Sequence, residues 1–224
     1  KVPTDMDMPE IGVQYNNSTV FKEENNILTD FFTTGKYDAN REFFKTNAPA
    51  MDILVSSNLE RLVWYMSGKD GDKVKEYMEK LKADGIYEVD ETFARIQDQF
   101  KAGYLNEEEV LKTIKDCYED NGYVLDTHTA CGYGVLKQYQ KETGDQTKTI
   151  LLSTASPYKF PESVYKALFN EELNVYDAIE KLNEKTGVAV PKPLVGIKDR
   201  EVLHKTHIDK TEIINFIKSE MEGL

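Results

Sequence analysis

Three hydroxyl side chains after a short apolar run give the strongest local signal for chemistry in this sequence. Ser153, Thr154 and Ser156 follow the run Thr149–Leu152, and Pro157 is suited to open a helix behind them. Ligands of open α/β sheets bind at the carboxyl ends of strands, and a helix N-terminus favours anions. The pattern therefore allows two interpretations: a ligand site, or hydroxyls that only cap the helix.

A second polar cluster, Ser56-Ser57-Asn58 with Glu60 and Arg61, stands where an apolar helical repeat begins. An arginine guanidinium can hold a phosphate or carboxylate through two parallel hydrogen bonds, so this cluster could face a substrate. The alternative is a helix cap followed by a solvated ion pair, which needs no function.

The remaining reactive side chains suggest structural roles. We expect His128 to be a hydrogen-bonded core histidine rather than a general base, and Cys131 to serve packing. His204 and His207 lack a third ligand, so we expect no metal site, and no residue is assigned as catalytic. The sequence contains no P-loop, GxGxxG or GxSxG motif. Two cysteines without CxxC spacing indicate neither a disulfide framework nor zinc, which favours a reducing cytoplasm.

Most of the segments that must position these groups have apolar residues at helical spacing. Caps are expected at Asn106 and Asp126, and Gly132 with Gly134 inside one helix predicts close packing against a neighbour. The run Thr149–Ser153 has no polar alternation, which predicts a central strand covered on both faces. The expected helices cover 26–34, 51–65, 72–81, 91–103, 107–121, 127–143, from 157 or 161 to 169, 175–182 and 211–221, and a further strand covers 86–89.

Composition narrows the classes of function. The 224 residues carry a formal net charge of −12, so no global cationic surface is present to bind nucleic acid or an anionic membrane. The longest apolar run, Leu62–Met66, is too short to span a bilayer, and acidic residues in 1–20 argue against an export signal there. The length suits one large domain or one and a half.

Four segments together resemble threonine synthase, over the carboxyl-terminal half of that family and from about residue 25 to 220 of this chain. They are NNILTDFF at 25–32, APAMDILVSSNLER at 48–61, GYVLDTHTA at 122–130 and STASPYKF at 153–160. The resemblance implies a pyridoxal-phosphate enzyme of the tryptophan-synthase-β fold type, which converts O-phosphohomoserine and water to threonine and phosphate.

The resemblance also implies roles for residues in the matching motifs. In this fold type a hydroxyl at a strand end faces the pyridine nitrogen of the cofactor, so Ser153 or Thr154 is expected to bind the cofactor, and Thr154 is preferred. A neutral hydroxyl does not force the ring nitrogen to be protonated. Ser56, Asn58 and Arg61 are implied to lie on the substrate side. Departures occur at Ser156, where many relatives have His, and at Thr127, where many have Pro.

The family's Schiff-base lysine segment and its Gly- and Asn-rich phosphate loop are not found in this sequence. We therefore expect an α/β, helix-rich partial domain of a fold-type II pyridoxal-phosphate enzyme, with few, mostly parallel strands. Residues 1–24 would be a lead segment, and 25–224 the carboxyl-terminal part of the large cofactor-binding domain. Alone, this chain is expected to be inactive and to need the missing amino-terminal part of the same enzyme. The alternative is a non-catalytic paralogue or an interaction module that keeps the fold.

Overall fold

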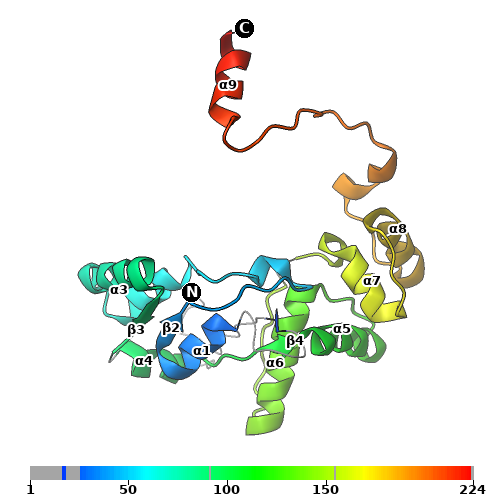
Figure 1. Cartoon of the computed structure of the whole chain (residues 1–224). Helices are drawn as coiled ribbons and strands as arrows, with labels where there is room; N and C mark the ends of the chain where they lie inside the picture. The colour runs from blue at the N-terminus through cyan, green and yellow to red at the C-terminus, as the bar shows by residue number, and fades with distance from the viewer. Residues whose placement is uncertain (1–16, 19–25, 91, 154, 223–224) are drawn as a thin grey trace. The chain divides into compact units, whose positions relative to one another are not determined.

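The structure is a computed structural model that describes residues 17–18, 26–90, 92–153 and 155–222 (Figure 1). The chain divides into two compact units, Lys1–Val190 and Pro191–Leu224. The described helices are α1 (Ile27–Thr34), α2 (Leu59–Met66), α3 (Gly71–Asp84), α4 (Thr92–Gln99), α5 (Glu107–Asn121), α6 (Thr127–Thr143), α7 (Pro161–Phe169), α8 (Val175–Thr186) and α9 (Ile213–Glu222). The described strands are β1 (Asn17–Ser18), β2 (Lys36–Asp38), β3 (Ile86–Glu88) and β4 (Leu105–Asn106), and short 3-10 turns η1 to η4 cover Pro49–Met51, Pro157–Lys159, Lys192–Leu194 and Ile197–Asp199. Helix-rich architecture with few strands, as expected, is confirmed.

The strands described here form two small two-stranded sheets. β1 and β4 pair in parallel, whereas β2 and β3 pair antiparallel with Tyr37 opposite Tyr87. Helices α1 to α4 pack around the β2–β3 pair, and their buried side chains form a continuous apolar core. We call this part of the first unit the α1–α4 group.

Aromatic rings stack through the middle of that core. Tyr37 and Tyr87 lie nearly parallel with their ring centres 5.2 Å apart. The ring of Tyr77, from α3, also stacks on the ring of Tyr87, with their centres 5.4 Å apart. Phe31 of α1 meets both Tyr37 and Tyr87 at 6.0 Å. Such ring pairs add about 0.5–1.5 kcal/mol each beyond the area they bury, so β2 and β3 are held rigidly.

Helices α5 to α8 form the rest of the first unit, with α5 packed against both α6 and α7, and α7 against α8 (Figure 1). Asn106 caps α5 through a complete capping box with Glu109, and Asp126 caps α6, as the sequence predicts. Helices α1, α3, α5 and α8 end at Gly35, Gly85, Gly122 and Gly187, each of which adopts a left-handed conformation.

Two predicted helices are shorter than expected. The helix predicted over 51–65 begins only at Leu59, because Pro49 opens a separate 3-10 turn and the Asp52 carboxylate accepts hydrogen bonds from Thr46. The Asn58 side chain makes no cap hydrogen bond, so the predicted cap function of this residue is wrong. The helix predicted over 91–103 ends at Gln99.

The predicted central strand over Thr149–Ser153 is wrong for the part of the chain that the structure describes. These residues belong to neither sheet, and the side chains of Ile150 and Leu152 are 69% and 71% exposed. An apolar run without alternation suits a strand between two neighbours, but strand formation also requires partner backbone groups. The described residues supply no such partners beside 149–153.

Gly134 confirms the close packing expected inside α6, and it supplies a test of that contact. A Cβ at this position would lie 2.4 Å from Leu105 Cδ1 and 3.1 Å from Thr113 Oγ1. In Gly134→Ala, overpacking should lower the free energy of unfolding by about 1–3 kcal/mol. The higher helix propensity of alanine offsets about 1 kcal/mol of this loss. Urea denaturation measures the difference.

Gly71→Ala is the matched control, because nothing lies within 4 Å of a Cβ built at Gly71 in α3. This variant should be as stable as the parent chain or slightly more stable. A Gly134→Ala chain as stable as Gly71→Ala would contradict the packing argument.

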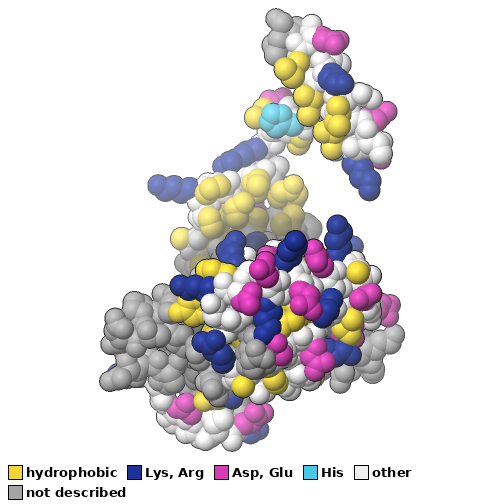
Figure 2. Space-filling model, turned by 90° about the vertical axis from the view of Figure 1, so that its left-hand side faces the viewer, with side chains coloured by type: hydrophobic (Ala, Val, Ile, Leu, Met, Phe, Trp, Pro, Cys, Tyr) yellow, Lys and Arg dark blue, Asp and Glu magenta, His cyan; other side chains and the backbone are white. Residues whose placement is uncertain are grey.

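The second unit contains the 3-10 turns η3 and η4 and helix α9. Many of its large apolar side chains are exposed, and four of these, Ile213, Ile214, Ile217 and Met221, lie on α9, whereas Phe216 of the same helix is half-buried. Figure 2 shows hydrophobic side chains in a row along this helix, at the top of the view. None of the described helices is both long enough and apolar enough to cross a lipid bilayer.

Candidate functional site

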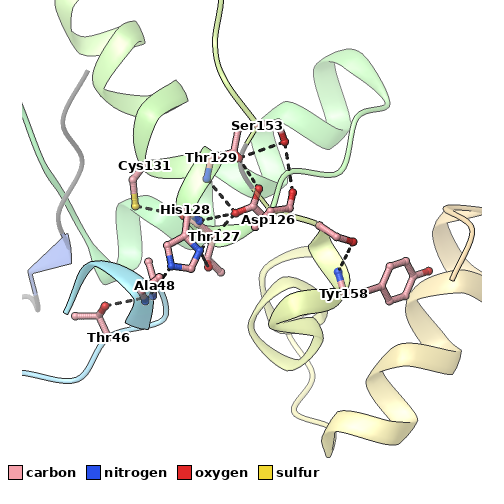
Figure 3. Close-up of polar contacts among 12 residues, drawn as sticks. Thr46, Ala48, Asp126, Thr127, His128, Thr129, Cys131, Ser153 and Tyr158 are labelled. Atoms are coloured by element: carbon pink, nitrogen blue, oxygen red, sulfur yellow. Dashed lines mark hydrogen bonds and ion pairs between the residues drawn. The ribbon is translucent and has the colours of Figure 1, made fainter. Parts of the chain in front are cut away.

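The first turn of α6 holds a buried polar cluster, drawn in Figure 3. The Asp126 side chain, in a residue that is 2% exposed, accepts backbone hydrogen bonds from His128 at 2.9 Å and from Thr129 at 3.1 Å. The Thr129 hydroxyl donates to the second Asp126 oxygen. One carboxylate thus satisfies three donors that no water reaches.

The electrostatics of Asp126 result from two opposing effects. Burial alone raises the pKa of this carboxyl, but the hydrogen bonds from His128 and Thr129 outweigh burial, and the pKa lies below its usual value. Asp126 is therefore a fixed negative charge at neutral pH, at the positive end of the α6 dipole.

Ser153 lies beside this cluster, and its hydroxyl is only weakly held. Its Oγ approaches Thr129 Oγ1 at 3.4 Å and the Ala155 carbonyl oxygen at 3.5 Å, both well beyond the usual 2.7–2.8 Å of hydroxyl hydrogen bonds (Figure 3). The residue itself is exposed. Among the described residues, the Ser153 hydroxyl thus makes only these two weak contacts, which a stronger hydrogen bond to a ligand would replace.

The predictions for the two neighbouring hydroxyls, those of Ser156 and Thr154, stand differently. Ser156 accepts a hydrogen bond from the Tyr158 amide at 3.2 Å, at the start of η2, so the capping interpretation holds for this residue. Thr154, the preferred partner of the cofactor ring, lies outside the described residues. Its role stays a prediction.

His128 is a core histidine, as expected. It is 3% exposed, its Nε2 accepts the Ala50 amide at 3.1 Å, and its Nδ1 lies 3.4 Å from Thr127 Oγ1. Because Nε2 accepts, the ring proton is on Nδ1 in this geometry. Cys131 is fully buried, with its Sγ 3.3 Å from the Thr127 carbonyl oxygen. The thiol is inaccessible, in agreement with the packing role predicted for Cys131.

A polar junction around residues 46–52 was not predicted from the sequence. The Asn47 backbone amide and side-chain amide both donate to the Glu107 carboxylate of α5, and Ser163 of α7 donates to Asn47 Oδ1 at 2.7 Å. Burial raises the pKa of Glu107, and the Asn47 hydrogen bonds oppose that rise. Together with the contact between Ala50 and His128, this junction ties the segment that precedes Ser56 to α5, α6 and α7.

The three predicted substrate residues lie at the start of α2. The Ser56 amide donates to the Tyr37 hydroxyl at 2.8 Å, and Asn58 is exposed. Arg61 is exposed as well and lines a cavity of about 370 Å³ with Trp64, Val74, Met78, Glu60, Gly71 and Lys75. The described contacts of these residues lie in the α1–α4 group, whereas those of Ser153 lie at α6.

Fold and site together define a class. The helix-rich first unit, with an exposed hydroxyl beside the buried Asp126 carboxylate, has the fold of part of a threonine synthase, as comparisons with solved structures show. The structure superposes on yeast threonine synthase with a TM-score of 0.72 and 30% identity, covering 89% of this chain and 41% of the yeast chain. Pyridoxal-phosphate-bound threonine synthase from Brucella melitensis gives a TM-score of 0.64 at 31% identity, covering 79% of this chain and 34% of that one.

Sequence comparison is more specific. Residues 129–209 match the family model described as threonine synthase, C-terminal. Human threonine synthase-like 1 is 34% identical over 166 residues, which are 73% of this chain and 22% of the human protein. The chain is thus similar to the carboxyl-terminal portion of threonine synthases, and it spans between about a fifth and two fifths of the length of these relatives.

Proposed function

We propose that the protein containing this chain converts O-phosphohomoserine and water to threonine and phosphate, as a pyridoxal-phosphate-dependent lyase of the cytoplasm. The observation that carries the proposal is the match of residues 129–209 to the threonine synthase C-terminal family model, because this region contains the hydroxyls at 153–154. The segment 153–154 would present a hydroxyl to the ring nitrogen, and Ser56, Asn58 and Arg61 would form part of the substrate wall.

The residues present suit that role. A neutral hydroxyl can hydrogen-bond an unprotonated ring nitrogen, and the buried Asp126 charge is fully engaged by its own donors and does not compete for the ring. When bound, the cofactor supplies an electron sink for the substrate's reacting carbon. The Arg61 guanidinium has the planar, charged geometry that holds a phosphate or carboxylate.

The activity test uses the complete protein, purified with pyridoxal phosphate. Phosphate release from O-phosphohomoserine, with threonine formed in equal amount, would support the proposal. A complete protein that binds the cofactor but releases no phosphate would contradict it.

A second candidate is a non-catalytic paralogue or interaction module with the same fold. Similarity to human threonine synthase-like 1 is as high as that to the threonine synthases of solved structure, so similarity alone does not separate the two. The upstream coding sequence distinguishes the two candidates. An in-frame cofactor segment that contains a lysine favours the enzyme, and its absence favours the second candidate.

The isolated chain is expected to form no specific adduct with pyridoxal phosphate. The described lysines are exposed apart from the half-buried Lys73, and several form ion pairs such as Lys112 with Asp116, so none lies in the desolvated pocket that activates a lysine as a nucleophile. Absorbance in the visible range, followed by borohydride reduction and peptide mapping, should show only weak and scattered modification. A single lysine modified in stoichiometric amount would contradict the expectation that this chain is incomplete.

A further inference from the structure

Tyr37 is a buried tyrosine whose hydroxyl serves a segment of backbone far from its own strand. Its side chain donates to the Leu54 carbonyl oxygen at 3.1 Å and accepts from the Ser56 amide at 2.8 Å. The two partners stand 17 and 19 residues away along the chain. One hydroxyl therefore satisfies a carbonyl and an amide that flank a single residue, Val55.

The ring that carries this hydroxyl is held rigidly. Tyr37 is 1% exposed, pairs with Tyr87 across the β2–β3 ladder, and stacks on it within 7° of parallel. Phe31 closes the side of the stack. The hydroxyl has little freedom to move, so the segment that hydrogen-bonds to it is fixed relative to the core.

Protonation favours the same arrangement. Burial raises the pKa of the Tyr37 phenol above its usual value, and this outweighs the opposing effects of the Ser56 amide and Arg41. The phenol consequently keeps its proton throughout the neutral range and remains able to donate to Leu54.

The segment held in this way leads directly into α2. The Ser56 carbonyl accepts from the Leu59 amide at 3.3 Å, so the position of Ser56 sets the first turn of the helix. Val55 is 58% exposed, and the Asn58 side chain provides no cap. The Tyr37 hydroxyl thus holds the backbone at the start of α2, where the Asn58 side chain makes no cap hydrogen bond.

We propose that Tyr37 is a positioning residue for substrate binding, which fixes Ser56 and the start of α2 so that Ser56, Asn58 and Arg61 meet the substrate preorganised. This proposal rests on the proposed function. A segment that is ordered before binding loses less conformational freedom on binding, which strengthens affinity without a new contact. Tyr37 itself touches no substrate in this assignment.

The test is Tyr37→Phe in the complete enzyme, with O-phosphohomoserine as substrate. We expect the KM to rise about three- to tenfold, while kcat and cofactor affinity change less than about twofold. The reason is that the variant weakens binding of the substrate and of the transition state equally and leaves the chemical step unchanged. In the isolated chain, the Ser56 amide should exchange its hydrogen faster than in the parent chain.

Tyr87→Phe is the matched control. It removes a hydroxyl from the same stack and leaves the contacts of Tyr37 with Leu54 and Ser56 intact, so KM and Ser56 exchange should stay at parent values. Equal KM values for Tyr37→Phe and the active parent enzyme would overturn the positioning role, and so would equal KM increases in both variants. A complete parent enzyme without activity overturns the proposed function instead, which is a different result.

Discussion

Replacing Asp126 by alanine is expected to lower the free energy of unfolding of this chain by about 2–4 kcal/mol. The change removes the α6 cap, and it leaves the His128 amide, the Thr129 amide and the Thr129 hydroxyl without their acceptor in a water-poor site. Denaturation in urea, followed by far-UV circular dichroism, measures the loss.

Asp70→Ala provides the control, because Asp70 also caps a helix but accepts only the Lys73 amide and is exposed. Its cost should stay near about 1 kcal/mol. Similar costs for the two variants would show that burial adds nothing at Asp126.

The Asp126 effect should also depend on pH. Because its pKa is lowered in the folded chain, its contribution is present above the unfolded-state value of 3.8 and is lost as pH falls through the folded value. Glu107 has a raised pKa and the opposite sign, so the wild-type curve alone does not isolate Asp126. The difference in unfolding free energy between wild type and Asp126→Ala isolates the contribution of Asp126. This difference should become smaller below about pH 4.

Thr154→Ala in the complete enzyme is expected to weaken cofactor retention by about 1–3 kcal/mol, which is about 5- to 150-fold in affinity, and to lower kcat. The reason is that a polar ring atom would lose its hydrogen-bond partner in a site that excludes water. Cofactor titration by absorbance and the melting temperature are measured on the same samples.

Ser153→Ala separates the neighbouring assignments, and it should be nearly silent if Thr154 faces the ring. If the hydroxyls only cap a helix, stability falls by about 0.5–2 kcal/mol while cofactor spectra stay normal. Loss of cofactor affinity in Ser153→Ala, with none in Thr154→Ala, would move the assignment one residue back. Successive residues of an extended segment point to opposite sides, so the two variants should not behave alike.

Local chemistry made much of the fold predictable. The caps at Asn106 and Asp126 and the glycine ends of the helices depend on residues within one turn, and these are where the sequence pattern and the structure agree. The buried position of His128 was expected as well. The helix at 51–65 was placed too early, because the Thr46–Asp52 contact competes locally with helical hydrogen bonds.

Long-range contacts set the limit of prediction at the candidate site. Asn47 meets Glu107 across 60 residues and Ser163 across 116, and no periodicity in the sequence encodes those pairings. The role of Tyr37 was missed for the same reason, since an aromatic residue in a short strand is indistinguishable from ordinary core. The hydroxyls of Ser153, Thr154 and Ser156 could be singled out because they stand within four residues of one another in the sequence, and the cofactor role of Ser153 or Thr154 stays a prediction.

The exposed run Thr149–Ser153 has a consequence for how this polypeptide behaves in solution. An extended apolar stretch with Ile150 and Leu152 facing water offers a template on which a second copy can add a strand and start self-association. The formal net charge of −12 opposes this, because like-charged copies repel. Salt shortens the range of that repulsion to about 10 Å at 0.1 M, so we expect self-association of the chain to increase with ionic strength.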